Sequence, residues 1–333
     1  MSLEVMRPGM LTSIQDLGRY GYQKHGVIVS GAMDTYALRA ANLLVGNKEG
    51  EAALEMTLTG PSLKAGQDLL VAITGGDLSP IVDGQPVPMW RPVLLKAGSV
   101  LQLGGAKSGC RAYLAVAGGY AVPKVMGSKS TYLRAGLGGF QGRALQTGDV
   151  LEVLPPQEAS LRIMRKLEPA PGSSFGSVKW SARERGIPGQ GRWVTVRALR
   201  GSEYDHFDES SRQSLWEEPL LVTPQSDRMG YRLSGPVFKL RQPFEMISEA
   251  VTLGTVQVPP DGNPIILLAD RQTAGGYPRI AQIAAADVPF IAQLKPGQRL
   301  KLREITREEA ERLYLEREEE IHALKTSVNM RFM

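Results

Sequence analysis

Short apolar segments separated by glycine and proline are the feature that most constrains this chain. It contains 37 glycines and 22 prolines in 333 residues, and these residues interrupt helices and strands at close intervals. The apolar segments between them are rich in Val, Ile, Leu and Ala, and the candidate strands are 69–74, 111–117, 192–199, 245–258 and 264–269. The sequence therefore predicts a mainly β fold.

Helical periodicity is confined to a few stretches. Residues 32–45 place Leu38, Ala41 and Leu44 on one face, and Gly46 follows as a natural C-terminal cap. Shorter helical turns are expected at 209–216 and 286–293.

A second long helix is expected at 306–325, near the end of the sequence. It opens with a capping box between Thr306 and Glu309. Its apolar stripe is narrow and the rest of its surface is acidic; the stripe consists of Leu313, Tyr314, Ile321 and Leu324. Because so polar a helix is marginal alone, we expect it to dock on the body of the protein or on a partner.

Three short motifs occur twice in the same order, which indicates two related domains. They are R-x-G-Y at 19–22 and 228–231, [ST]-G-P at 59–61 and 234–236, and A-G-G-Y at 117–120 and 274–277. The stretch between the two halves is rich in Pro, Gly and Ser and lacks periodicity. We expect a first β-barrel domain at 1–155, a connecting segment at 156–191, a second barrel at 192–303 and a helical extension at 304–333.

Composition excludes several classes of protein. The formal net charge of +5 is modest and scattered, unlike the dense basic blocks of nucleic-acid binders. One cysteine excludes an internal disulfide and fits a reducing compartment. We identify neither a signal peptide nor an apolar run of the ~20 residues that span a bilayer. A cytoplasmic protein that binds neither nucleic acid nor membrane is expected.

Nucleotide and metal motifs also fail. GGAKSG at 104–109 lacks the glycines that a phosphate loop requires, and GLGGFQG at 136–142 lacks the third glycine of a dinucleotide loop. The histidines, His25, His206 and His322, lie far apart in sequence, so no metal site is expected. We expect no cofactor on this chain.

Polar side chains follow directly on the apolar run 264–269. Asp270, Arg271, Gln272 and Thr273 stand where a barrel strand would end, and Gly275, Gly276 and Tyr277 come next. A guanidinium grips a carboxylate bidentately. We therefore predict that Arg271 binds a substrate carboxylate, Gln272 holds an amide or carbonyl, and Asp270 orients the guanidinium. The glycines would let the backbone approach the ligand closely.

Further Arg-, Ser- and Tyr-containing clusters lie beside glycines in both halves. Arg228 and Tyr231 are candidate neighbours of the Arg271 site, and Arg19, Ser30 and Asp34 form a similar group in the first half. For each cluster, an Arg–Asp pair that merely braces loops remains the alternative.

Several of these segments together resemble the biotin-dependent carboxyltransferase-type family, which includes allophanate hydrolase subunit 2, the C subunit of 5-oxoprolinase and the antagonist of a sporulation-kinase inhibitor. The resemblance runs from about Arg7 to Arg303, and the segments that carry it are 13–47, 54–63, 74–80, 111–132, 226–236 and 270–281.

The resemblance implies cyclophilin-like β-barrel domains and a complex with a sister subunit, a homologue of the 5-oxoprolinase B subunit or of allophanate hydrolase subunit 1. In bacterial 5-oxoprolinase, these two subunits join a third to convert 5-oxoproline to glutamate at the expense of ATP. The chain is thus expected to be a subunit of a hydrolase acting on a cyclic amide, inactive alone, with ATP used by the complex.

Two alternatives stay open. In the first, the chain is a regulatory protein that antagonises a kinase-inhibitor homologue. In the second, it is the carboxyltransferase-like component of a urea or allophanate amidolyase.

Overall fold

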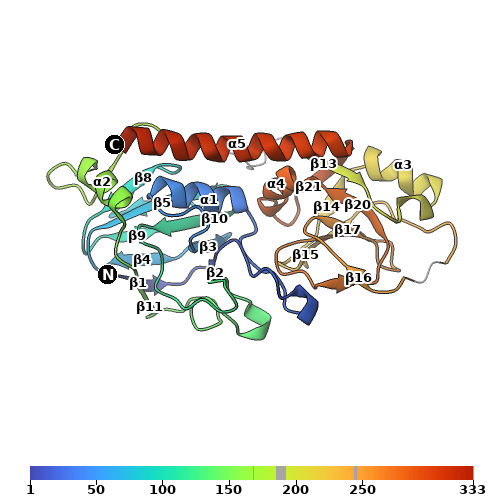
Figure 1. Ribbon diagram of the computed structural model, residues 1–333, viewed down its shortest axis with the longest axis horizontal. Coiled ribbons are helices and arrows are strands. Elements are labelled where there is room, and N and C mark those ends of the chain that lie inside the picture. The colour runs from blue at the N-terminus through green and yellow to red at the C-terminus, as the bar shows by residue number, and fades with distance from the viewer. Residues whose placement is uncertain (168, 185–192, 244–245, 333) are drawn as a thin grey trace. The chain divides into compact units, whose positions relative to one another are not determined.

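The computed structural model describes residues 1–167, 169–184, 193–243 and 246–332, and it is mainly β, as predicted (Figure 1). The chain divides into two compact units. The first contains Met1–Arg19, Ser30–Ile187 and Glu319–Met333, and the second contains Tyr20–Val29 and Pro188–Glu318. Neither unit is a continuous piece of chain, in contrast to the predicted boundaries at 155, 191 and 303.

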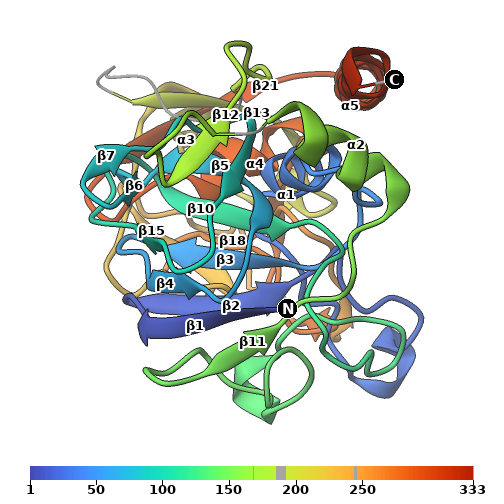
Figure 2. The same cartoon turned by 90° about the vertical axis from the view of Figure 1, so that its left-hand side faces the viewer.

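The first unit builds its core between two six-stranded sheets (Figure 2). One sheet contains, in spatial order, β11 (Val150–Glu152), β1 (Ser2–Arg7), β4 (Ser62–Ala65), β9 (Val100–Gln102), β6 (Ile81–Val82) and β7 (Gln85–Pro86). The other contains β12 (Phe175–Ser177), β8 (Pro92–Leu95), β5 (Leu69–Asp77), β10 (Ser108–Val116), β3 (Ala53–Thr57) and β2 (Leu11–Gln15). Their facing apolar side chains form one buried cluster that includes Leu3, Leu63, Leu54 and Leu114.

The strands of the two sheets differ in sequence pattern because one sheet faces solvent on its outer side and the other is covered there by a helix. In β1, buried Leu3 and Val5 alternate with Glu4 and Met6, which face solvent. Strands β5 and β10 are buried along nearly their whole length, since α1 (Thr35–Leu44) packs on their other face. Burial on both faces explains why these two segments read as unbroken apolar runs.

Helix α1 lies within the predicted range 32–45. Its start is fixed by Asp34, whose carboxylate accepts a hydrogen bond from the Ala37 amide at 2.9 Å. Such a side-chain cap satisfies one of the free amides of the first turn. Gly46, with a φ of 77°, follows the helix.

The described part of the predicted connector 156–191 contributes to the first unit instead. Its described part contains α2 (Glu158–Lys166), and β12, which pairs with β8 at the edge of a sheet. The Ser160 hydroxyl donates to the Val45 carbonyl at 2.7 Å, which ties α2 to the end of α1. Prolines and glycines around these short elements obscured their periodicity in the sequence. Residues 168 and 185–191 of the connector lie outside the described part.

The second unit contains a closed barrel. Its strands, in order around the barrel, are β13 (Val194–Arg200), β20 (Arg279–Ile283), β17 (Thr255–Gln257), β18 (Ile265–Leu267), β15 (Gly230–Ser234), β14 (Leu220–Val222) and β21 (Arg299–Glu304). Strands β13 and β21 are parallel, and the other neighbours are antiparallel. The expected strand 245–258 is two strands, β17 and β16 (Glu249–Ala250), and β16 pairs with β19 (Ala274–Gly275) outside the barrel.

Short helical segments complete both units. The two predicted turns are present as α3 (Glu209–Glu217) and as η4 (Ala285–Asp287) with α4 (Val288–Ala292). Further 3-10 turns are η1 (Gln23–His25), η2 (Leu133–Ala135) and η3 (Tyr204–His206).

The C-terminal helix α5 (Arg307–Phe332) is longer than predicted. Leu313 and Ile321 are buried as expected, but Tyr314 is 44% exposed, because it lies off the buried stripe. The stripe continues instead through Val328 and Phe332, which join Ile321 in a buried cluster of the first unit together with side chains of α1. The helix therefore does dock on the body of the protein.

Candidate functional site: the rim of the barrel after β18

Asp270 and Arg228 form a buried ion pair just past the end of β18. The Arg228 Nε and Nη2 atoms donate to the two carboxylate oxygens of Asp270 at 2.9 and 3.0 Å. Both side chains are less than a tenth exposed, and the Asp270 amide also donates to the Arg228 carbonyl at 2.9 Å. Asp270 thus orients Arg228, not Arg271 as predicted from the sequence. The pair braces the loop before β15 against the end of β18.

Tyr231, Gly275 and Gly276 also contact other residues of the protein at the positions where the sequence suggested a ligand. Tyr231 is buried, and its hydroxyl donates to the Leu294 carbonyl at 3.1 Å. A Cβ atom at Gly275 would lie 2.5 Å from the Gln257 amide nitrogen, and one at Gly276 would lie 3.2 Å from the Ser248 hydroxyl. The space beside these two glycines is occupied by protein side chains, where the sequence suggested a ligand.

Arg271 has a different environment. Its guanidinium is half-buried and donates two long hydrogen bonds, to the carbonyls of Leu268 at 3.3 Å and Val251 at 3.5 Å. Burial lowers its pKa below the ordinary value, and the nearby Tyr20 phenol partly offsets this. Within the described residues, no carboxylate forms an ion pair with Arg271. A cation held by carbonyl dipoles alone is suited to bind an anion.

Exposed polar side chains accompany Arg271 in the second unit. Gln272 is exposed, Thr273 is half-buried, and Tyr277 is 43% exposed in the turn after β19. Tyr20 is 67% exposed and was not among the residues singled out from the sequence. It is the variable residue of the first R-x-G-Y motif, and that motif spans the boundary between the units, because Arg19 belongs to the first and Tyr20 to the second.

The other predicted cluster stabilises loops of the first unit. Arg19 is fully buried and donates to the carbonyls of Val125 and Ser130, both at 2.9 Å. Ser30, whose φ is 57°, donates to the Thr131 carbonyl at 3.0 Å. Asp34 caps α1, as described above.

Beside this cluster, the buried carboxylate of Asp16 organises the loop around residue 129. It accepts hydrogen bonds from the hydroxyls of Ser128 and Ser130 at 2.7 and 2.6 Å, and from the amides of Lys129 and Gly18 at 2.6 and 2.8 Å. A carboxylate with this many donors is satisfied within the fold.

A buried hydrogen-bond network of Tyr113 and Glu55, which was not predicted from the sequence, supports the start of α1. The Tyr113 hydroxyl donates to Glu55 Oε2 at 2.7 Å and accepts from the Asp34 amide at 2.8 Å. Glu55 also accepts from the Met33 amide at 2.8 Å. Burial raises the pKa of Tyr113, so the phenol stays neutral. The one available signal was a glutamate inside the apolar stretch 52–56.

Two negative observations apply to the described ranges. No group of three or more His, Cys, Asp or Glu side chains there is arranged to hold a metal ion. No described helix combines the length and the apolar character that crossing a membrane requires.

Comparison with known proteins identifies the family. Residues 25–304 match the carboxyltransferase domain, subdomain A and B. The chain belongs to this carboxyltransferase domain family. It is 40% identical to the 5-oxoprolinase C subunit of Haemophilus influenzae over 301 residues, covering 90% of each chain. It is also 40% identical to the 5-oxoprolinase C subunit of Escherichia coli over 309 residues, covering 92% of this chain and 93% of that one.

A solved structure supports the same assignment. The crystal structure of the K. lactis urea amidolyase matches 97% of this carboxyltransferase-family chain with a TM-score of 0.86 and 30% identity. The match covers 20% of that larger chain. The family resemblance seen in the sequence is thereby confirmed.

Proposed function

We propose that this chain is the C subunit of an ATP-dependent 5-oxoprolinase, which opens 5-oxoproline to glutamate. The two bacterial relatives support this choice, because each aligns with this chain over nine tenths or more of its own length. The urea amidolyase relative is matched over only a fifth of its chain. We further propose that a sister subunit of the B type and a third subunit complete the enzyme, that ATP is used by the complex without binding tightly to this chain, and that the enzyme is cytoplasmic.

The observation that carries a role for this chain in the reaction is the environment of Arg271. 5-Oxoproline bears a carboxylate next to its lactam ring, and a guanidinium pairs with carboxylates through two parallel hydrogen bonds. Arg271 is half-buried, positioned by two carbonyls and not paired with a carboxylate of the described chain. In the proposal, the substrate carboxylate neutralises Arg271 and Gln272 contacts the lactam amide. Asp270, Arg228 and Tyr231 hold the rim in place.

The test is turnover by the reconstituted complex, with Arg271 replaced by Ala. Losing a hydrogen bond to a charged group costs about 1.5–3 kcal/mol, so kcat/KM for 5-oxoproline should fall roughly ten- to a hundredfold. Arg232→Ala is the matched control, because Arg232 is an exposed arginine on β15 of the same barrel. Unfolding temperature and assembly of the complex should be unchanged in both variants.

A substrate lacking the carboxylate makes the assay specific. 2-Pyrrolidinone has the lactam ring of 5-oxoproline but no carboxylate for Arg271 to bind. It should therefore be turned over more slowly than 5-oxoproline, and at the same rate by the original and Arg271→Ala enzymes. Full activity of Arg271→Ala toward 5-oxoproline would remove Arg271 from the site. Turnover of urea or allophanate in place of 5-oxoproline by the complex would favour the amidolyase alternative, and assembly without turnover of any of them would favour the regulatory one.

A further inference from the structure

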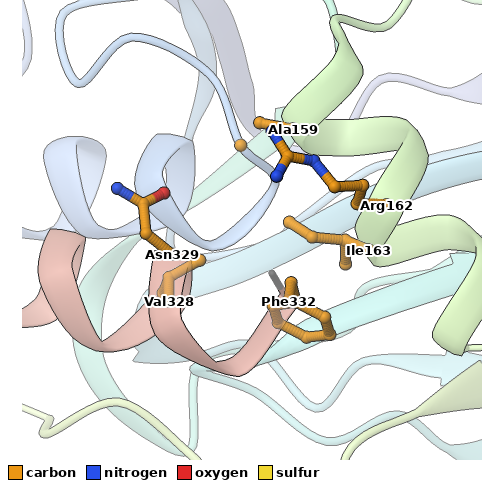
Figure 3. A pocket seen from close by; sticks show the side chains of 7 residues that line it. Ala159, Arg162, Ile163, Val328, Asn329 and Phe332 are labelled. Atoms are coloured by element: carbon orange, nitrogen blue, oxygen red, sulfur yellow. The ribbon is translucent and has the colours of Figure 1, made fainter.

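Two adjoining hollows lie on the first unit, between the end of α1, α2 and the last turns of α5. The smaller has a volume of about 220 Å³. Figure 3 shows the side chains around it, which include Ala159, Arg162, Ile163, Val328, Asn329 and Phe332. The larger, of about 480 Å³, shares Gly46, Ala159 and Asn329 with the first and extends to Lys48 and Lys325. Together they form a groove, called here the α2–α5 groove.

The floor of the smaller hollow is apolar and well anchored. Ile163, Val328 and Phe332 are each less than a tenth exposed. The Phe332 ring packs against Trp180 at 6.0 Å between centroids, and the Lys166 ammonium lies 5.8 Å above it. Lys166 also donates to the Arg331 carbonyl at 3.1 Å. These contacts fix the last turn of α5, so the floor exists before any ligand arrives.

The rim of the groove carries cations that the described chain does not neutralise. Arg162, Lys48 and Lys325 are exposed, and none of them forms an ion pair with a described carboxylate. The acidic residue on the rim, Glu49, is already paired, because it accepts from Arg39 Nε and Nη2 at 3.2 and 3.0 Å. The groove therefore has an excess of positive charge beside an apolar floor.

This combination selects a ligand by its chemistry. Small-molecule sites in proteins are concave, mainly apolar and supplied with a few polar groups that fix orientation, and their volumes start at about 300 Å³. We propose that the α2–α5 groove binds a small amphiphilic anion, with a short apolar group on Ile163, Val328 and Phe332 and a carboxylate or phosphate monoester among Arg162, Lys48 and Lys325. The proposal is independent of the proposed function, because these residues lie on the first unit and the barrel rim on the second.

Methyl NMR on the full-length chain tests it directly. The Ile163 and Val328 methyl resonances are followed while sodium hexanoate or hexyl phosphate is added. Both resonances should shift in a saturable manner when the probe with the fitting head group is added. If only one of the two probes causes these shifts, its head group is the one that the groove binds. Hexanol, which lacks the charge, and acetate, which lacks the chain, should each bind about tenfold more weakly or worse.

Charge-removing variants complete the test. Arg162→Gln combined with Lys325→Gln should weaken binding by about tenfold or more, since charge-assisted hydrogen bonds are lost. Lys64→Gln, on an exposed lysine of β4, should leave binding unchanged. The proposal is overturned if neither probe shifts these methyl groups at about 20 mM, a concentration well above the ~1 mM Kd of even a weak site, if hexanol binds as well as the anions do, or if the double variant binds unchanged.

Discussion

Replacing Asp270 by Asn removes the charge that faces Arg228 inside the second unit. The side chains of this pair are 6% and 8% exposed, so solvent screens their interaction little. Removing one partner of such a buried pair costs about 3–5 kcal/mol, because the remaining charge stays buried. Asparagine keeps the shape and can still accept one hydrogen bond, so we expect a cost at the lower end, about 3 kcal/mol. At about 2–4 °C per kcal/mol, the second unit should melt about 6–12 °C lower.

The measurement combines thermal unfolding with hydrogen exchange. Exchange should accelerate in peptides that cover β15 and β18, which flank the pair, and stay unchanged in β5 and β10 of the first unit. Arg228→Met combined with Asp270→Leu should be less destabilised than the sum of the two single changes, because no unpaired charge is left. A melting temperature of Asp270→Asn within about 2 °C of the original, which corresponds to about 1 kcal/mol or less, or strict additivity of the two changes, would refute this account.

Three further changes test other contacts. Phe332→Ala should cost the first unit about 3–5 kcal/mol by urea unfolding, because it removes a large side chain from a buried cluster; a loss under about 1 kcal/mol would show that the last turn of α5 is dispensable. Gly275→Ala should destabilise the second unit by about 1–3 kcal/mol, because the new Cβ atom would displace the side-chain amide of Gln257. Unchanged unfolding would contradict that packing. The hydrogen-bonded Arg143 guanidinium lowers the pKa of Asp149 below its ordinary value of 3.8, so this pair stabilises the fold above about pH 4 and the contribution is lost as the pH falls below that value. Acid unfolding of Asp149→Asn should therefore lack this component, and an unchanged pH profile would count against it.

Local sequence signals predicted much of the fold, because they act over a few residues. The apolar runs that became β5, β10 and β18, the C-terminal cap at Gly46 and the capping box at Thr306 all encode their elements within one or two turns of chain. The three-residue strand β12 carries no such signal and is ordered through its pairing with the distant strand β8. Helix α2 is amphipathic, but its nine residues between prolines were too short a stretch to be recognised as a helix.

The candidate site shows the same limit more sharply. The sequence placed Asp270 and Arg271 together at a strand end, and their adjacency suggested a partnership. The three-dimensional fold brings Arg228 from 42 positions away to Asp270 and leaves Arg271 with carbonyl partners. Which of two neighbouring polar residues braces the protein and which is left for a ligand depends on long-range pairing. Tyr20 could not be foreseen near Arg271 for the same reason.

The division of the chain into interleaved segments has a consequence for its synthesis. The sheets of the first unit are encoded up to Ser177, yet Phe332 completes a hydrophobic cluster of that same unit. At about 5–20 residues per second, translating the intervening stretch takes on the order of 10–30 s. During that interval, the surface of the first unit that α5 covers in the folded protein is exposed to water, because α5 has not yet been translated. The second unit is still being synthesised at that time. Synthesis of the first unit thus starts first and also ends last, and a chaperone that shields the apolar surface of α1 and α2 would act in that interval.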